Sequence, residues 1–283
     1  METEEKLKKL KNILKKMECV IIAYSGGVDT TFLLAVAKRV LKDKVLAVTA
    51  VSPLYPRKEL RFAREQAKKL GVKHILIRSR EMQDKKFVEN PLQRCYYCKD
   101  DLYGQLRKLA EKEKIKYILD GTNYSDRKDF RPGIKAGKKW QICHPLEEAK
   151  LTKEEIRLLS KKMGLVTWDK PAQACLASIF PYGEKITLEK LKMVERAENY
   201  LNQLGFKQVR VRTYDGRLFG DLARIELGKE EMVKLTPLIA DKIVKKLKSL
   251  GYRYVTLDLE GYRTGSMNEL TNYASVKSNT STT

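Results

Sequence analysis

The sequence has no long hydrophobic run and only five cysteines among its 283 residues. No apolar segment approaches the roughly 20 residues that a helix needs to cross a bilayer, which argues against a membrane protein. Residues 1–18 have a helical period with charges of both signs and lack the apolar core of a signal peptide, so we expect a cytoplasmic address. Few cysteines in such a protein argue against a disulfide framework and favour metal or reactive-thiol chemistry.

Acidic residues are scarce relative to basic ones. The chain has 58 Lys and Arg against 36 Asp and Glu, a net charge of +22. Such an excess favours polyanionic partners, namely nucleotides, phosphorylated substrates or RNA. The alternative is that the lysines solvate helix faces, as residues 63–71 and 241–251 suggest, and the charge alone leaves both interpretations open.

Short apolar runs alternate with amphipathic stretches in the first half of the chain. The pattern predicts strands at 20–23, 44–51, 74–79 and 116–123, with helices at 58–71 and 98–114 between them. This order indicates an α/β domain, a parallel sheet with helices on both faces. Ligands of such sheets bind beyond the carboxyl ends of the strands, where the sequences SGGVD, SPLYPR and DGTN fall.

The pattern changes after a helical stretch at 151–164. We expect a first domain over 1–170, a connection over 171–186 that carries Cys175, a smaller α+β domain over 187–270, and a disordered tail over 271–283. Within the second domain the pattern predicts helices at 187–205 and 232–251 and strands at 208–216, 222–227 and 254–259.

The loop between the first strand and the following helix has the sequence SGGVDT, residues 25–30. Gly26 and Gly27 allow backbone N–H groups to approach a phosphate closely, and the helix adds its positive N-terminal end. Ser25, Thr30 and Thr31 can donate hydroxyl hydrogens, and Asp29 can hold Mg²⁺ or order the loop. The loop is not a Walker A motif, because the lysine of that motif is missing. The alternative is a glycine-rich turn that merely connects strand to helix.

Three cysteines are candidates for chemistry. Cys95 and Cys98 have the CxxC spacing of a redox pair, half a zinc site or a structural turn. Cys175 lies between the expected domains. His144 is expected to be a hydrogen-bonded loop histidine, although its addition to the three thiols would make a Cys₃His zinc site. The remaining thiols are expected in the core: Cys19 and Cys143.

Several motifs together carry a specific resemblance. SGGVDT matches the signature of the PP-loop ATP pyrophosphatase superfamily. AYSGGVDTTFLL, RCYYCK, DFRPGIKA, PAQACLAS, PYGEKIT and DLEGYRTGSMN resemble the LarE family, ATP-dependent sulfur transferases that make the nickel-pincer nucleotide cofactor of lactate racemase. The resemblance implies an adenine nucleotide alpha hydrolase-like fold, ATP with Mg²⁺, and a homo-oligomer. The nucleotide-binding residues that it implies are Ser25, Gly26, Gly27, Asp29, Thr30 and Gly121.

The resemblance also implies a reaction on pyridinium-3,5-biscarboxylic acid mononucleotide. A substrate carboxylate is adenylated with release of pyrophosphate, and sulfur then replaces AMP to give a thiocarboxylate. In some members one cysteine gives up its own sulfur, and Cys175 corresponds to it. Other members hold a 4Fe-4S cluster with three cysteines, which correspond to Cys95, Cys98 and Cys175. Three thiolates leave one iron free to bind sulfide from a donor, so the cysteine count favours the cluster, with sacrifice of Cys175 as the alternative.

Basic residues of the second domain are candidates for the substrate phosphate. Arg210 and Arg212 alternate along a strand, so they face the same side and can form a two-pronged anion site. Ser178 and Arg263 are further candidates, and the alternative is a pair of strand arginines exposed to solvent. Members of the family carry an arginine after the serine, where this chain has Ile179. Weaker candidates are Arg224 and Ser266.

Two other functions remain open. A tRNA thiolation enzyme would use the same ATP and cluster chemistry on a base carbonyl, and the charge of +22 suits RNA. Against it, the sequence has no flanking zinc-ribbon cysteine pairs and no recognised RNA-binding module. A non-enzymatic nucleotide sensor would keep SGGVDT without needing the three cysteines.

Overall fold

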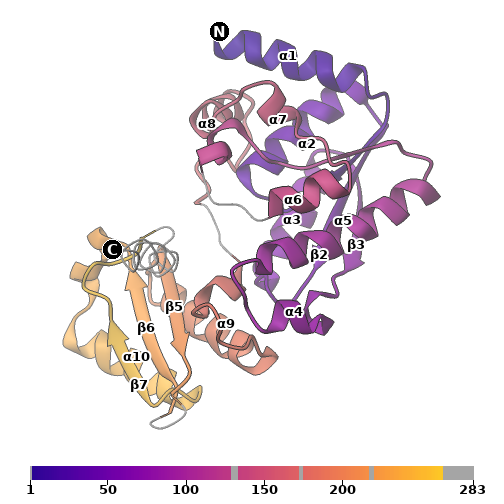
Figure 1. The fold of residues 1–283 in the computed structure, drawn as a ribbon. Helices are drawn as coiled ribbons and strands as arrows, with labels where there is room; N and C mark the ends of the chain where they lie inside the picture. Colours follow the sequence, from indigo (N-terminus) through magenta and orange to yellow (C-terminus); the bar gives the residue numbers. More distant parts are fainter. Residues whose placement is uncertain (1, 129–132, 172–174, 217–219, 264–283) are drawn as a thin grey trace, which may run out of the picture. The chain divides into compact units, whose positions relative to one another are not determined.

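The computed structural model describes residues 2–128, 133–171, 175–216 and 220–263. The chain forms two compact units, drawn as a ribbon in Figure 1. The first comprises residues 1–87 and 92–174, and the second comprises residues 88–91 and 175–283. A short piece from the middle of the first unit's sequence therefore belongs to the second.

The first unit contains a four-stranded parallel sheet. Its strands are β1 (Val20–Ala23), β2 (Val45–Val51), β3 (Lys73–Arg78) and β4 (Tyr117–Leu119), in the order β3-β2-β1-β4. The expected α/β class with a parallel sheet is confirmed. Since all four strands run the same way, the segments after β1, β2 and β4 meet at one edge of the sheet.

Helices cover both faces of this sheet. The first unit contains α1 (Thr3–Lys15), α2 (Val28–Leu41), α3 (Arg57–Lys69), α5 (Arg94–Lys112), α6 (Gly133–Lys139), α7 (Pro145–Glu148) and α8 (Lys153–Lys162), and α4 (Lys85–Val88) runs to its boundary. Alternate residues of β1 separate two hydrophobic cores, because side chains of a strand point to opposite faces. Val20 and Ile22 pack with α1, α2, α3 and α8, whereas Ile21 packs with residues of α5 and α6.

The second unit contains a three-stranded sheet. Its strands are β5 (Val209–Tyr214), β6 (Leu222–Leu227) and β7 (Tyr254–Leu257), with β5 antiparallel and β7 parallel to the central β6. Helix α9 (Leu188–Gln203) precedes β5, and α10 (Pro237–Ser249) connects β6 to β7. The second unit thus contains a sheet together with helices, in agreement with the expected α+β character.

The prediction of one helix over 232–251 is wrong about where that helix begins. Residues Lys229–Lys234 form a separate 3₁₀ helix, and α10 begins only at Pro237. The hydroxyl of Thr236 accepts a hydrogen bond from the Ile239 N–H, which caps the new helix. Proline is favoured at the first helical position because it has no N–H to leave unpaired there.

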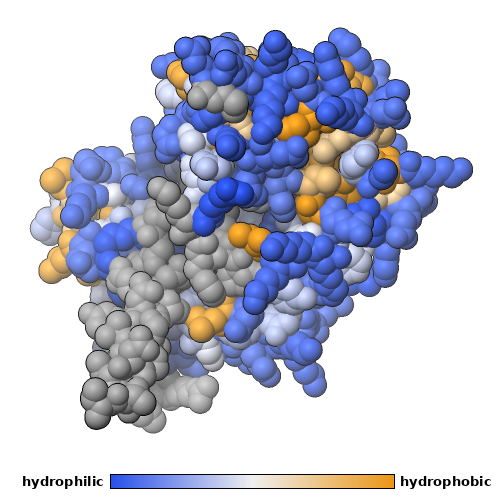
Figure 2. Space-filling model, turned by 45° about the horizontal axis from the view of Figure 1, so that its top comes forward, coloured by the Kyte–Doolittle hydropathy of each residue, from blue (hydrophilic) through white to orange (hydrophobic). Residues whose placement is uncertain are grey.

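Among the described residues, none of the helices is long and apolar enough to cross a membrane. On the face shown in Figure 2 hydrophilic residues predominate and hydrophobic ones form smaller patches. The tail expected at 271–283 lies outside the described residues.

Candidate functional site

The SGGVDT loop lies at the carboxyl end of β1 and leads directly into α2. Gly26 has a φ of +72°, a conformation that only glycine adopts readily, and Gly27 is the N-cap residue of α2. A Cβ atom on Gly26 would lie 2.8 Å from the Cβ of Ala63 in α3. The absence of a side chain at Gly26 is therefore a steric requirement, and it leaves the backbone of the loop accessible at the positive end of a helix.

Hydroxyl groups hold the loop in shape. The Ser25 and Thr30 hydroxyl oxygens lie 3.0 Å apart, and the Gly27 N–H donates to the Ser25 hydroxyl at 3.3 Å. The Thr49 hydroxyl of β2 donates to the Tyr24 carbonyl at 2.6 Å, which fixes the residue before the loop. Burial raises the pKa of Tyr24 to about 12, so this phenol stays neutral at physiological pH.

Asp29 points to groups that follow β4. One carboxylate oxygen pairs with the ammonium of Lys153 in α8, and the other accepts a hydrogen bond from the Asn123 side chain at 3.3 Å. Gly121 packs at the same place, since a Cβ there would lie 2.7 Å from the Thr30 Cγ2. The structure thus brings together the expected residues Asp29, Thr30 and Gly121 from segments that are far apart in the sequence.

A buried carboxylate, Asp120, links β4 to α5. It accepts hydrogen bonds from the Tyr103 hydroxyl at 2.6 Å and the His144 Nδ1 at 2.7 Å, and the Lys99 ammonium lies 4.0 Å away. Burial alone would raise the pKa of Asp120, but the hydrogen bond from His144 and the charge of Lys99 hold that pKa well below its usual range. The hydrogen bond to Asp120 likewise raises the pKa of His144, against the effect of burial. His144 is therefore a hydrogen-bonded histidine, as expected.

The CxxC pair lies in the first turns of α5. Cys95 is exposed and Cys98 half-buried, and their spacing places both thiols on one face of the helix. Lys99 and Tyr103 hold the same stretch of α5 to Asp120. The pair is thus presented on a helix anchored to the sheet edge at which the loop lies.

Cys175 begins a short 3₁₀ helix, Leu176–Ile179, in the second unit. The Ser178 hydroxyl donates to the Cys175 carbonyl at 2.7 Å. The Ser178 carbonyl in turn accepts a hydrogen bond from the Arg212 guanidinium at 2.9 Å. The structure thus brings together three expected residues of the second unit, and Arg212 braces the turn that follows the cysteine.

The two strand arginines are buried rather than exposed to solvent, so the alternative of solvated arginines is wrong. Arg210 is 4% exposed and pairs with Glu198 of α9, while Arg212 is 5% exposed and pairs with Glu226 of β6. Both nitrogens of the Arg212 fork donate to Glu226 at 2.9 Å, a bidentate geometry. Buried charges of this kind require paired partners, and two carboxylates meet that requirement.

The remaining basic candidates, Arg224 and Arg263, are also paired with carboxylates. Arg224 donates to Glu226 at 3.0 Å, so one carboxylate is shared by two arginines. Arg263 pairs with Glu260, three residues before it. Ser266 lies outside the described residues. In the part of the chain that the structure describes, no three His, Cys, Asp or Glu side chains form a group that could hold a metal ion.

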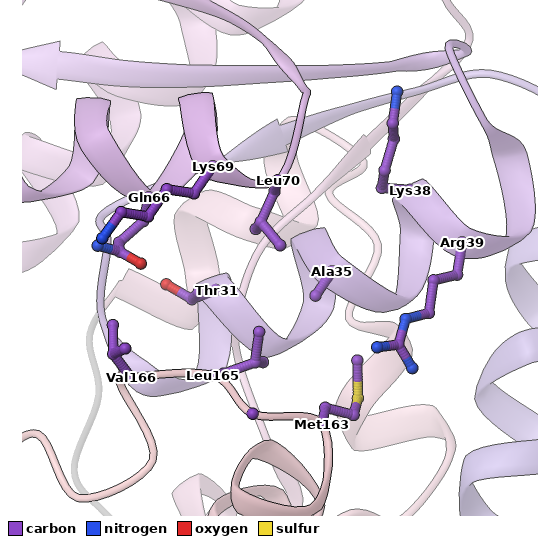
Figure 3. A pocket seen from close by; sticks show the side chains of 11 residues that line it. Thr31, Ala35, Lys38, Arg39, Gln66, Lys69, Leu70, Met163, Leu165 and Val166 are labelled. Atoms are coloured by element: carbon purple, nitrogen blue, oxygen red, sulfur yellow. The ribbon is translucent and has the colours of Figure 1, made fainter.

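A cavity of about 380 Å³ lies along α2. Figure 3 shows Thr31 and Ala35 of α2 on one side and, on another, Gln66 of α3 and Leu70, which directly follows that helix. Leu165 is among the other lining residues. Of the candidate site residues that the structure describes, Thr31 alone is among those that line it.

Sequence reasoning missed the partners that hold the candidate residues. No role is assigned from the sequence to Lys153, Asp120, Glu198 or Glu226, yet each contacts or braces a candidate residue. The alternation of Glu226 with apolar residues along β6 predicts a carboxylate on the solvent side, so its complete burial could not be inferred from the pattern.

The chain is similar to known proteins over nearly its entire length. No family model matches it. It is 44% identical to an uncharacterized protein of Synechocystis over 268 residues, 94% of this chain and 98% of that protein. It is 37% identical to the pyridinium-3,5-bisthiocarboxylic acid mononucleotide synthase of Lactiplantibacillus plantarum over 257 residues, 90% of this chain and 91% of the synthase. A glutamine-hydrolyzing GMP synthase of Aeropyrum pernix is 25% identical over 197 residues, 63% of this chain and 38% of that enzyme.

Proposed function

Because the chain belongs to the family of the pyridinium-3,5-bisthiocarboxylic acid mononucleotide synthase, the LarE family, we propose that it is an ATP-dependent sulfur transferase acting on a pyridinium mononucleotide. The observation that carries the proposal is the SGGVDT loop itself. Bare glycine backbone, hydroxyls and a carboxylate meet at the start of α2, an arrangement suited to the pyrophosphate of ATP.

The chemistry of the substrate carboxylate explains why the reaction would need ATP. A carboxylate oxygen is a very poor leaving group, so it first attacks the α-phosphorus of ATP and pyrophosphate leaves. Sulfur then adds to the activated carbonyl carbon, the C–O bond to AMP breaks, and a thiocarboxylate and AMP result. Asp29 would hold Mg²⁺, because carboxylate oxygens suit that ion, and the loop would hold the departing pyrophosphate.

Thiolates are the usual ligands of a 4Fe-4S cluster, and the chain has three candidate cysteines. Cys95 and Cys98 share one helical face at the start of α5, are accessible to differing degrees, and would supply two thiolates, with Cys175 as the third. When bound by three thiolates, such a cluster supplies one iron that can hold exchangeable sulfide. Transfer of the sulfur of Cys175 itself is the competing route.

The buried arginines of the second unit would bind the phosphate of the mononucleotide. Glu198 and Glu226 fix the two guanidinium groups in place, so little side-chain entropy remains to be lost on binding. The contact between Arg212 and Ser178 would join that phosphate site to the turn of Cys175.

The test is anaerobic incubation with ATP, Mg²⁺, sulfide and pyridinium-3,5-biscarboxylic acid mononucleotide, followed by mass spectrometry of the small molecules. We expect AMP, pyrophosphate and a product in which sulfur replaces a carboxyl oxygen. A parallel incubation replaces the mononucleotide with tRNA. Thiolated tRNA and an unchanged mononucleotide would overturn the proposed substrate, and release of no pyrophosphate in either incubation would overturn the adenylation chemistry.

A further inference from the structure

Lys170, near the end of the first unit's sequence, contacts the SGGVDT loop. The ammonium of Lys170 donates to the Gly26 carbonyl at 3.2 Å and to a carboxylate oxygen of Glu59 at 2.6 Å. It also lies 4.0 Å from the ring centroid of Phe62, and only 16% of the Lys170 side chain is exposed. Three contacts of different kinds thus define where this charge lies, against the backbone of the phosphate-binding loop.

The backbone of this segment is also fixed. Arg157 of α8 donates to the carbonyl of Trp168 at 2.7 Å and to that of Lys170 at 2.8 Å. The guanidinium therefore holds the segment by two carbonyl groups at once. Because both the backbone and the ammonium are fixed, the position of the charge is built into the fold.

The SGGVDT loop contains no positively charged residue of its own. A Walker A loop carries its own lysine next to the phosphates, whereas SGGVDT has none. In a planar trans peptide the carbonyl and the N–H of the next residue point in opposite directions, so a hydrogen bond to the Gly26 carbonyl also orients the Gly27 N–H. The ammonium accordingly acts on the loop in two ways, by orienting a backbone donor and by adding a positive charge.

We propose that Lys170 is a positioning residue of the ATP site, supplying from the end of the unit the cation that the loop lacks. This inference rests on the proposed function, since it assumes that the loop binds the phosphates of ATP. Lys170 precedes Cys175 by five positions, so the residue that holds the loop also begins the segment that leads to the cysteine.

The test compares Lys170→Met, which keeps the aliphatic stem over Phe62, with Lys170→Arg, which keeps the charge. Affinities for MgATP, pyrophosphate and adenosine are measured by calorimetry, without the mononucleotide or sulfide. We expect Lys170→Met to weaken MgATP and pyrophosphate about tenfold, as loss of a charge-assisted contact does, and to leave adenosine within about twofold. Lys170→Arg should restore most of the affinity.

The matched control is Lys161→Met. Its ammonium lies 4.5 Å from the ring centroid of Trp168, a similar contact near the same segment, so this variant should bind all three ligands normally. If Lys170→Met does not fold, the double variant Glu59→Gln with Lys170→Met removes the carboxylate left without its partner and should show the same loss. Equal affinities for wild type and Lys170→Met, or an equal loss for all three ligands, would overturn the inference. A wild type that binds no MgATP would overturn the proposed function with it, whereas a wild type that binds MgATP but transfers no sulfur would leave this comparison valid.

Discussion

Asp29 and Lys153 form an ion pair at the carboxyl end of the sheet, although 124 positions separate them in the sequence. Asn123 holds the second oxygen of the same carboxylate. The loop carboxylate is therefore oriented by two other segments of the unit before any nucleotide binds.

Replacement of this carboxylate should stop the first half of the reaction. We expect Asp29→Ala to abolish pyrophosphate release while the protein stays folded, because no group then organises Mg²⁺ and the departing phosphates. A pyrophosphate assay and circular dichroism measure the two effects. Asp43→Ala is the control, since Asp43 is an almost fully exposed carboxylate beyond the other end of α2 and should not matter. Near-normal pyrophosphate release by folded Asp29→Ala would refute the role.

The steric requirement at Gly26 can be separated from its backbone conformation. Gly26 and Gly164 both have a φ of +72°, but a Cβ on Gly164 meets nothing within 4 Å. Gly164→Ala should therefore cost only the conformational strain, roughly 1–2 kcal/mol, and keep normal ATP binding. Gly26→Ala adds the clash with Ala63 and should lose ATP binding as well. Urea unfolding and calorimetry with MgATP make the comparison, and equal results for the two variants would contradict the close packing of the loop on α3.

Replacement of Arg212 should change the KM for one substrate more than the KM for the other. Arg212→Ala is expected to raise the KM for the mononucleotide about tenfold or more and to change the KM for ATP little, because it removes a charge-assisted phosphate contact. It should also lower the free energy of unfolding by about 3 kcal/mol, since it breaks a buried ion pair of Glu226. Steady-state kinetics and urea unfolding test this, with Arg196→Ala on the exposed side of α9 as control. An equal rise in both KM values would place Arg212 outside the phosphate site.

The pair of Asp120 and His144 should make stability depend on pH. The folded-state pKa of His144 is raised above the ordinary 6.5, so its contribution is complete below pH 6.5 and is lost as pH rises through the folded value. The pKa of Asp120 is lowered from 3.8, so its contribution is lost only as pH falls below that value. Urea unfolding between pH 4 and 9 should show the wild type losing stability above about pH 6.5. His144→Asn should be less stable and flat in that window, and a parallel fall in both proteins would assign the effect to another group.

The competing sulfur routes differ in what happens to Cys175. If a cluster supplies the sulfur, the reconstituted protein should transfer more than one sulfur per chain and Cys175 should keep its mass. Sacrifice would remove H₂S from Cys175 and leave dehydroalanine, which peptide mass spectrometry detects. Stoichiometric dehydroalanine at position 175, with Cys95→Ala and Cys98→Ala fully active, would exclude the cluster route.

The sequence predicted the parallel sheet well because its inner strands β1 and β2 are largely buried and have nearly continuous apolar runs, as in Val20–Ala23. It failed at residues 232–236, where an apolar helical period continues across a break that Thr236 and Pro237 impose locally. Periodicity shows which face is buried but does not show where the backbone hydrogen bonds stop.

The sequence predicted the residues of the SGGVDT loop but not the residues that hold the loop in place. SGGVDT is contiguous, so its glycines, hydroxyls and carboxylate can be recognised together. Lys153 and Lys170 reach the same loop from 124 and 144 positions away, and only the folded chain shows that they do. The arginine pair was likewise visible as an alternation along β5, whereas its burial depended on Glu198 and Glu226 of other elements.

The assignment of residues 88–91 to the second unit has a consequence for building chimaeras between relatives. The Asn90 side chain donates to the Pro181 carbonyl at 2.7 Å, and the Asn90 carbonyl accepts from the Gly183 N–H at 2.9 Å. A chimaera with a single breakpoint before Cys175 would take Asn90 from one parent and Pro181 and Gly183 from the other. Exchange of the second unit as a working module therefore requires two inserts, one of them only four residues long.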